Sequence, residues 1–212
     1  MSDFANLFEE ARQEFADAAN GKPSVWNQYW QVAPRYNERH RKYHVASHIL
    51  DVLSLAELIM MKDFPWKFDL VNPCITAIVW HDAVYIPGSK TNEYDSSVLA
   101  DAAGFRDRKI IEAIRKTKTH EEPDSILEMI VLDADLMAGL APDRDQYRTN
   151  SSLVRDEYSV FTDEEYYIER KAVLRGSLDR PNIFSTRFAS QFEADVRENM
   201  EGELADIISK GF

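Results

Sequence analysis

The chain has little cysteine, little glycine and no long apolar run, and each shortage narrows what it can be. Its 212 residues include one cysteine, Cys74, which excludes an internal disulfide and a metal cage of paired cysteines. Such sparing use of cysteine is typical of a reducing compartment, so we expect a cytoplasmic protein. No stretch approaches the roughly eighteen uninterrupted apolar residues of a membrane span, and the acidic start MSDFANLFEE does not resemble a secretory signal.

Basic residues are outnumbered as well. There are 25 Lys and Arg against 37 Asp and Glu, which gives a formal net charge of −12. Because phosphate backbones attract clustered cations, this balance excludes a general nucleic-acid platform. It leaves room for a small anionic substrate, since the field in a pocket can oppose the global charge. Basic clusters at 35–42 and 106–118 fit such a pocket or a solvated helix face.

Helical spacing of apolar residues runs through nearly the whole chain, which has only 7 glycines. We therefore predict an all-α protein. Without a repeat, a low-complexity tract or a linker, residues 1–212 should form a single compact helical domain. The predicted helices cover 4–19, a short stretch around 25–30 ending before Pro34, 43–61, a segment starting at 72, 92–103, 106–118, 124–138, 144–160 and 185–209.

Some of these boundaries rest on local signals. Asn72 and Pro73 suit an N-cap and a first helical turn, although the short β-branched segment behind them also fits a buried strand. We favour the helix because its neighbours are helical. Residues 83–93 read as a loop with a turn at 87–88. Further N-terminal caps are predicted at Asp124 or Ser125, and capping-box spacing joins Thr162 and Glu165.

Several polar residues interrupt apolar segments. All the histidines lie between positions 40 and 120, and the unusual positions are His44, His48, His81, Asp82, His120, Asp133 and Asp135. Each alone has an ordinary explanation, such as a surface histidine pair or a carboxylate that caps a neighbouring helix. Together they interrupt three separate core-forming helices. A divalent cation would compensate several buried ligands at once. Two imidazoles and two carboxylates suit Mn, Fe, Co, Ni or Zn, and Mg less well.

The order of these residues resembles the H…HD…D signature of the HD superfamily of metal-dependent phosphohydrolases. The neighbourhood is similar to a subfamily of small bacterial predicted HD phosphohydrolases, through YHVASHI (43–49), HDAVYIPGSKTNEYDSS (81–97), TKTH (117–120) and LDADL (132–136). The resemblance covers about residues 43–136. It implies a helix bundle like that of HD-domain phosphodiesterases, with the helices of 144–209 packed on this core.

The resemblance also implies a ligand set. His48, His81, Asp82 and one aspartate of the DAD stretch should bind the metal. Residues two apart on a helix lie roughly 200° apart, so only one of the two aspartates should face the site. We choose Asp135, with Asp133 as the reserve.

His44 resembles the histidine that donates a proton to the leaving group in cyclic-nucleotide phosphodiesterases. Either ligand carboxylate, with Asp82 as one candidate, could accept the proton of the attacking water. Glu93 could orient water or substrate, and His120 could neutralise the phosphate. Basic residues with the same possible role are Arg39, Arg115 and Lys118.

The sequence departs from better-known relatives in two ways. It has HDAVY in place of HDIGK, and only His120 lies where dinuclear members usually place two histidines. We therefore expect one divalent transition metal per chain. The expected reaction is hydrolysis of a phosphate mono- or diester of a nucleotide or small phosphorylated metabolite. Alternatives are a di-iron oxygenase, a non-catalytic metal- or nucleotide-binding module, and core histidines without a site. Trp26 and Trp30 suit either the core or a homodimer face.

Overall fold

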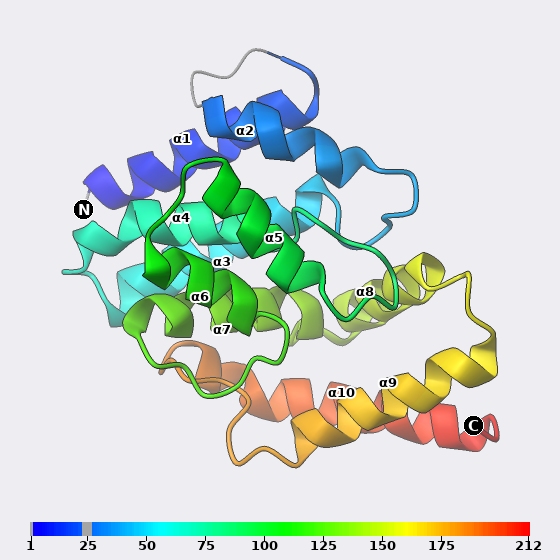
Figure 1. Ribbon diagram of the computed structural model, residues 1–212. Helices are drawn as coiled ribbons and strands as arrows, with labels where there is room; N and C mark the ends of the chain where they lie inside the picture. Colours follow the sequence, from blue (N-terminus) through cyan, green and yellow to red (C-terminus); the bar gives the residue numbers. More distant parts are fainter. Residues whose placement is uncertain (1, 23–26) are drawn as a thin grey trace.

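Figure 1 shows the computed structural model of the protein, which describes residues 2–22 and 27–212. The protein is all-α, as predicted, and these described residues form no β-strand. The α-helices are α1 Ser2–Ala19, α2 Asn27–Val32, α3 Ala46–Asp63, α4 Val71–Trp80, α5 Asn92–Ala102, α6 Arg108–Lys116, α7 Ile126–Leu140, α8 Arg144–Glu157, α9 Asp163–Leu178 and α10 Glu193–Ser209. Short 3-10 helices are η1 Ala33–Asn37, η2 Phe68–Leu70 and η3 Ala189–Phe192.

Local signals placed many helix ends correctly. The segment with Asn72 is helix rather than strand, and the side chain of Ser125 caps α7 by accepting from the backbone N–H of Glu128. Thr162 and Glu165 form the predicted capping box of α9. Trp26 and the side chain of Trp30 lie outside the described residues.

Several predicted helix starts differ from the structure. The N-cap of α4 is Leu70, two residues before Asn72. Helix α3 begins at Ala46 rather than near Tyr43, because side chains elsewhere in the fold bind the backbone of the preceding segment. For the same reason α10 begins at Glu193 and not near 185.

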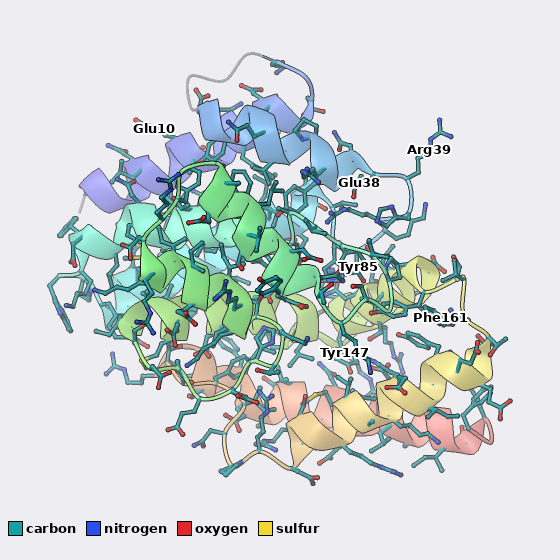
Figure 2. The ribbon with its side chains drawn as sticks, in the orientation of Figure 1. Glu10, Glu38, Arg39, Tyr85, Tyr147 and Phe161 are labelled. Atoms are coloured by element: carbon teal, nitrogen blue, oxygen red, sulfur yellow. The ribbon has the colours of Figure 1, made fainter. Side chains whose placement is uncertain are left out.

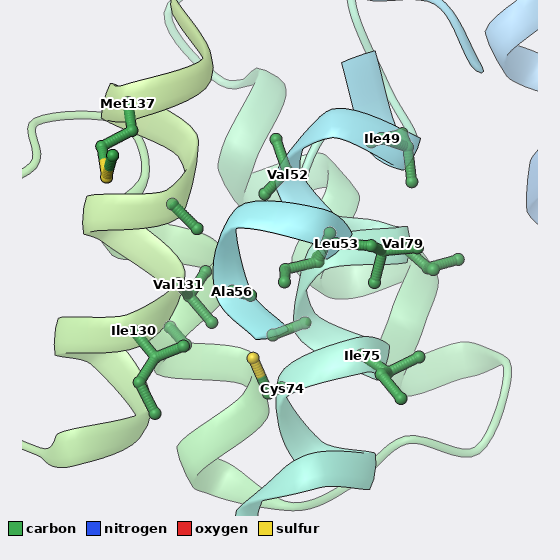
Figure 3. Packing of buried hydrophobic residues seen from close by; sticks show 14 of the residues in the cluster. Ile49, Val52, Leu53, Ala56, Cys74, Ile75, Val79, Ile130, Val131 and Met137 are labelled. Carbon is green, nitrogen blue, oxygen red and sulfur yellow. The ribbon is translucent and has the colours of Figure 1, made fainter. Parts of the chain in front are cut away.

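The centre of the core lies between α3, α4 and α7, whose apolar faces meet (Figure 3). On α3 the buried positions follow the i, i+3, i+4 spacing of one helix face. Residues shown in this packing are Ile49, Val52, Leu53, Ala56, Cys74, Ile75, Val79, Ile130, Val131 and Met137. Among the described residues, no helix is long and apolar enough to cross a membrane.

The other helices surround this centre. Helix α1 packs on α3 and α4, and α6 packs on α4 and α7. Helices α9 and α10 run antiparallel along one edge of the molecule (Figure 1), and α10 contacts α7. The start of α3, the end of α4 and the middle of α7 are therefore held close together by packing on all sides.

The turn at Gly88 gives a test of packing near this region. Gly88 has φ +81°, and a Cβ there would lie 2.6 Å from Cζ of Phe161. Gly88→Ala should therefore lower the free energy of unfolding by about 2–3 kcal/mol, through left-handed strain and overpacking together. Gly21→Ala is the matched control, because Gly21 has φ +75° with nothing within 4 Å of its Cβ position. It should lose only about 1 kcal/mol. Urea unfolding measures both variants. Equal losses of unfolding free energy would show that the Phe161 ring moves aside without cost.

Candidate functional site

Three helices bring the predicted metal ligands together. His48 lies in the first turn of α3, His81 is the C-cap of α4, and Asp82 follows it directly. Asp135 lies in the middle of α7. His48, His81 and Asp82 are buried, and their ligand atoms lie within 4.8 Å of one another, so this group could hold a metal ion. Residues far apart in the sequence thus form one cluster inside the core.

The distances within the cluster are short. Nε2 of His81 lies 3.0 Å from Oδ2 of Asp82 and 3.5 Å from Oδ1 of Asp135. Nε2 of His48 lies 3.2 Å from the same Asp135 oxygen and 3.8 Å from Oδ2 of Asp82. Both imidazoles therefore direct Nε2 toward both carboxylates.

The two Nε2 atoms are nevertheless without a directed hydrogen bond. Each is inaccessible to solvent and has no hydrogen-bond partner of ordinary geometry among the described residues, and the same holds for Nδ1 of His48. Nδ1 of His81 donates to the carbonyl of Ile78 at 2.7 Å, so Nε2 is the ring nitrogen that faces the carboxylates. A buried polar atom without a partner costs free energy, and a cation between the four side chains would supply that partner. The cluster could therefore hold a metal ion.

The charges of the cluster compensate one another. Burial would lower the pKa of His81, but the carboxylates of Asp82 and Asp135 raise it well above its usual value. Burial would raise the pKa of either carboxylate, and the neighbouring histidines lower both below the usual range. The cluster thus favours ionised carboxylates, which are the form that binds cations.

His44 lies at the edge of the cluster. It precedes α3 instead of sharing that helix with His48, and the two rings are 5.6 Å apart between centroids. Its side chain is 20% exposed, whereas those of His48 and His81 are 2% exposed. Nε2 of His44 lies 4.0 Å from Oδ2 of Asp82. His44 is therefore reachable from outside while it still faces the cluster.

Glu157, at the end of α8, holds His44 in this position. Its Oε2 accepts from Nδ1 of His44 at 2.7 Å, and its Oε1 accepts the backbone N–H groups of Lys42, Tyr43 and His44 at 2.8–2.9 Å. Burial would raise the pKa of Glu157, but His44 and these N–H groups lower it to about 2. Burial would also lower the pKa of His44, and the charges of Asp82 and Glu157 raise it instead. The sequence around Glu157, RDEYSVF (155–161), gave no signal for this role.

Two further residues around His44 were not predicted. The guanidinium of Arg41 is buried and donates to the backbone carbonyls of His44 and Asp82 at 3.2 and 2.8 Å. The ring of Tyr85 stacks on His44 with centroids 4.1 Å apart. Arg41 belongs to the basic cluster 35–42, and the sequence does not indicate that Arg41 is buried while other basic residues of the cluster are exposed. Arg41 and Tyr85 together hold the segment before α3 against the segment after α4.

His120 contacts the cluster from the connection between α6 and α7. Its Nε2 lies 3.0 Å from Oδ2 of Asp135, the oxygen other than the one facing His48 and His81. The predicted role of His120 in neutralising a phosphate stays a prediction; in the structure its imidazole contacts the carboxylate of Asp135. Both oxygens of Asp135 are therefore engaged.

Asp133, the alternative ligand, binds backbone N–H groups elsewhere in the fold. Asp133 is 1% exposed and accepts the backbone N–H groups of Ser185 and Thr186, at 3.0–3.1 and 2.6 Å. It caps the segment that leads into η3, which matches the ordinary explanation for a carboxylate in an apolar helix. Within the DAD stretch, the structure places Asp135 in the cluster and Asp133 outside it.

Other predicted contributors lie apart from the cluster. Glu93 makes no hydrogen bond or ion pair with it in the part of the chain that the structure describes. Arg39 extends from the loop after η1 into solvent, whereas Tyr85 points inward (Figure 2). Arg115 donates to Ser97 at 2.9 Å, and Lys118 donates to the carbonyl of Lys90. Among the residues that the structure describes, no contact therefore joins these cations to the His/Asp cluster.

Comparisons with known proteins add no further constraint. Scans of protein-family models, curated proteins and solved structures found no match for this chain.

Proposed function

We propose that the protein is a metal-dependent phosphohydrolase. Its substrate would be a phosphate mono- or diester of a nucleotide or a small phosphorylated metabolite. His48, His81, Asp82 and Asp135 would hold one Mn, Fe, Co, Ni or Zn ion. When bound, such an ion supplies a positive charge for a phosphoryl oxygen and a water of lowered pKa. The resemblance of these residues to the HD signature supports this choice of reaction.

The observation that carries the proposal is the pair of buried Nε2 atoms without hydrogen-bond partners. A cluster that served only the core would pair its imidazoles with aligned carboxylates or carbonyls. In His81, Nδ1 is paired and Nε2 is not, which is the arrangement of a metal-ligating histidine, whereas both ring nitrogens of His48 are unpaired.

The surroundings of His44 support hydrolysis over a structural metal. Because Glu157 occupies Nδ1, the Nε2 of His44 is left to donate a proton to the leaving oxygen. A purely structural metal site does not require a partly exposed histidine held beside its ligands. Either ligand carboxylate would accept the proton of the attacking water.

Metal content per chain tests the proposal directly. Plasma mass spectrometry of protein purified without added metal should find about one transition metal per chain, and none in Asp82→Ala. Asp101→Ala is the matched control, because Asp101 is exposed on α5 and should leave the metal in place. The wild type with Mn²⁺ or Co²⁺ restored should hydrolyse a nitrophenyl phosphate mono- or diester. Undiminished hydrolysis by Asp82→Ala would refute the mechanism.

The same measurement separates the alternatives. About two irons per chain, with an optical change that depends on oxygen, would favour the oxygenase. A metal-loaded protein that binds a nucleotide and hydrolyses no ester would favour the non-catalytic module. Absence of metal after incubation with Mn, Co, Ni or Zn would mean that the histidines are core residues.

A further inference from the structure

His120 reaches the cluster from an unusual backbone conformation. It has φ 48°, and in the described chain it is the one residue other than glycine in the left-handed region. Its N–H donates to the carbonyl of Lys116, so it occupies the left-handed position that commonly ends a helix. Glycine or asparagine is usual there, and strain of this kind persists where the surroundings enforce it. The imidazole at this position bonds Asp135, so the strained turn places a side chain in the site.

Arg180 holds this turn from another part of the fold. It lies between α9 and α10, and its Nη1 donates to the carbonyl of His120 at 2.7 Å. Its Nη2 donates to the carbonyl of Thr119. A planar guanidinium that bridges two successive carbonyls restricts the backbone between them, which is the backbone that carries His120.

The segment that carries Arg180 is itself fixed. Arg197 of α10 donates to the carbonyls of Leu178 and Arg180, at 2.9 and 2.7 Å. Glu193 of α10 pairs with Arg197 at 2.7 Å and accepts the N–H of Ile183 at 3.1 Å. Farther along, Asp133 accepts the N–H groups of 185 and 186. The guanidinium of Arg180 is thus presented by a connection bound at both ends.

We infer that Arg180 is a positioning residue for the metal site. It holds the strained turn at His120 so that the imidazole hydrogen-bonds Oδ2 of Asp135 and leaves Oδ1 facing His48 and His81. Hydrogen bonds to the second oxygen of a ligating carboxylate orient the first, and their loss typically weakens metal affinity 10–100-fold. This inference rests on the proposed metal site. It makes the affinity of that site depend on Arg180, which lies in the connection between α9 and α10.

Titration of the metal-free chain with Co²⁺ tests the inference without any assay of activity. Affinity is measured by competition with a chromophoric chelator, and the visible Co²⁺ spectrum reports the ligand set. Arg180→Gln should bind Co²⁺ about tenfold more weakly than the wild type, and Arg180→Lys should be intermediate. Arg175→Gln is the matched control, because Arg175 is exposed on α9 and its side chain has no partner among the described residues. It should bind like the wild type.

A double variant separates positioning from general damage to the fold. His120→Asn keeps a residue that tolerates the left-handed backbone but is too short to reach Asp135, so its affinity should also fall about tenfold or more. Because Arg180 acts through His120, adding Arg180→Gln to His120→Asn should lower the affinity no further.

Two outcomes would overturn the inference, and they differ from failure of the proposed function. In one, Arg180→Gln binds Co²⁺ like the wild type while His120→Asn binds weakly. In the other, the two losses multiply in the double variant. A wild type that binds no Co²⁺ would instead refute the metal site, and the inference with it.

Discussion

Glu157→Gln should lower the free energy of unfolding at pH 7 by about 3 kcal/mol and reduce the proposed hydrolysis about 100-fold. The first figure follows from the pKa of this buried carboxyl, which falls from the ordinary 4.5 to about 2 on folding. One Glu157 oxygen accepts three backbone N–H groups and the other accepts from His44. Glutamine has only one acceptor oxygen, so its amide must face one of these donors. Hydrolysis should fall because His44 loses the partner that orients it.

The stability difference should shrink on acidification. Because the folded pKa of Glu157 lies below the unfolded one, its contribution is fully present above about pH 4.5. It is lost as the pH falls from there toward about 2. Glutamine does not titrate, so the variant lacks this loss. The unfolding free energies of the two proteins should therefore converge between about pH 5 and 2.

Urea unfolding at pH 7 and pH 3, followed by circular dichroism, measures both effects. Glu164→Gln serves as the control, because Glu164 is exposed in the first turn of α9 and should change stability by less than about 0.5 kcal/mol. A Glu157→Gln protein as stable as the wild type at pH 7 would show that the segment before α3 does not depend on this carboxylate.

The contrast between His81 and Glu157 shows which part of the site the sequence could reveal. His81 and Asp82 stand out because they end an apolar helix, where a polar pair needs an explanation. Asp135 stands out for the same reason within α7. Glu157 lies 113 residues from His44 in an amphipathic, charged helix, where one more carboxylate is unremarkable. Its role exists only once α8 packs beside the start of α3.

The wrong helix starts have the same physical origin. Periodicity predicted helix from near Tyr43 and from near Ser185, and both segments carry apolar residues at suitable spacing. In the fold, Glu157 binds the N–H groups before α3, and Asp133 binds those before η3. A carboxylate from a distant helix thus accepts the backbone N–H groups that carbonyls of a further helical turn would otherwise accept. Local propensity cannot anticipate such a partner.

Asp133→Asn and Asp135→Asn should have opposite effects, although the residues are two positions apart. Asp133 faces the 185–186 backbone, so its variant should keep Co²⁺ affinity within about threefold of the wild type and lose about 2 kcal/mol of stability. Asp135 faces His48 and His81, so its variant should fold and bind Co²⁺ at least about 100-fold more weakly. The difference follows from the roughly 200° that separates them on the helix.

Thermal unfolding of the metal-free proteins and Co²⁺ titration of each variant provide the two readouts. The isosteric substitutions keep the volume of α7 unchanged, so each variant is the packing control for the other. Loss of metal from a folded Asp133→Asn, with Asp135→Asn unaffected, would mean that α7 presents its other face to the histidines. The carboxylate that holds the 185–186 backbone would then have to be a ligand as well. The oxygens of Asp133 already accept the N–H groups of residues 185 and 186. For this reason we assign the metal to Asp135.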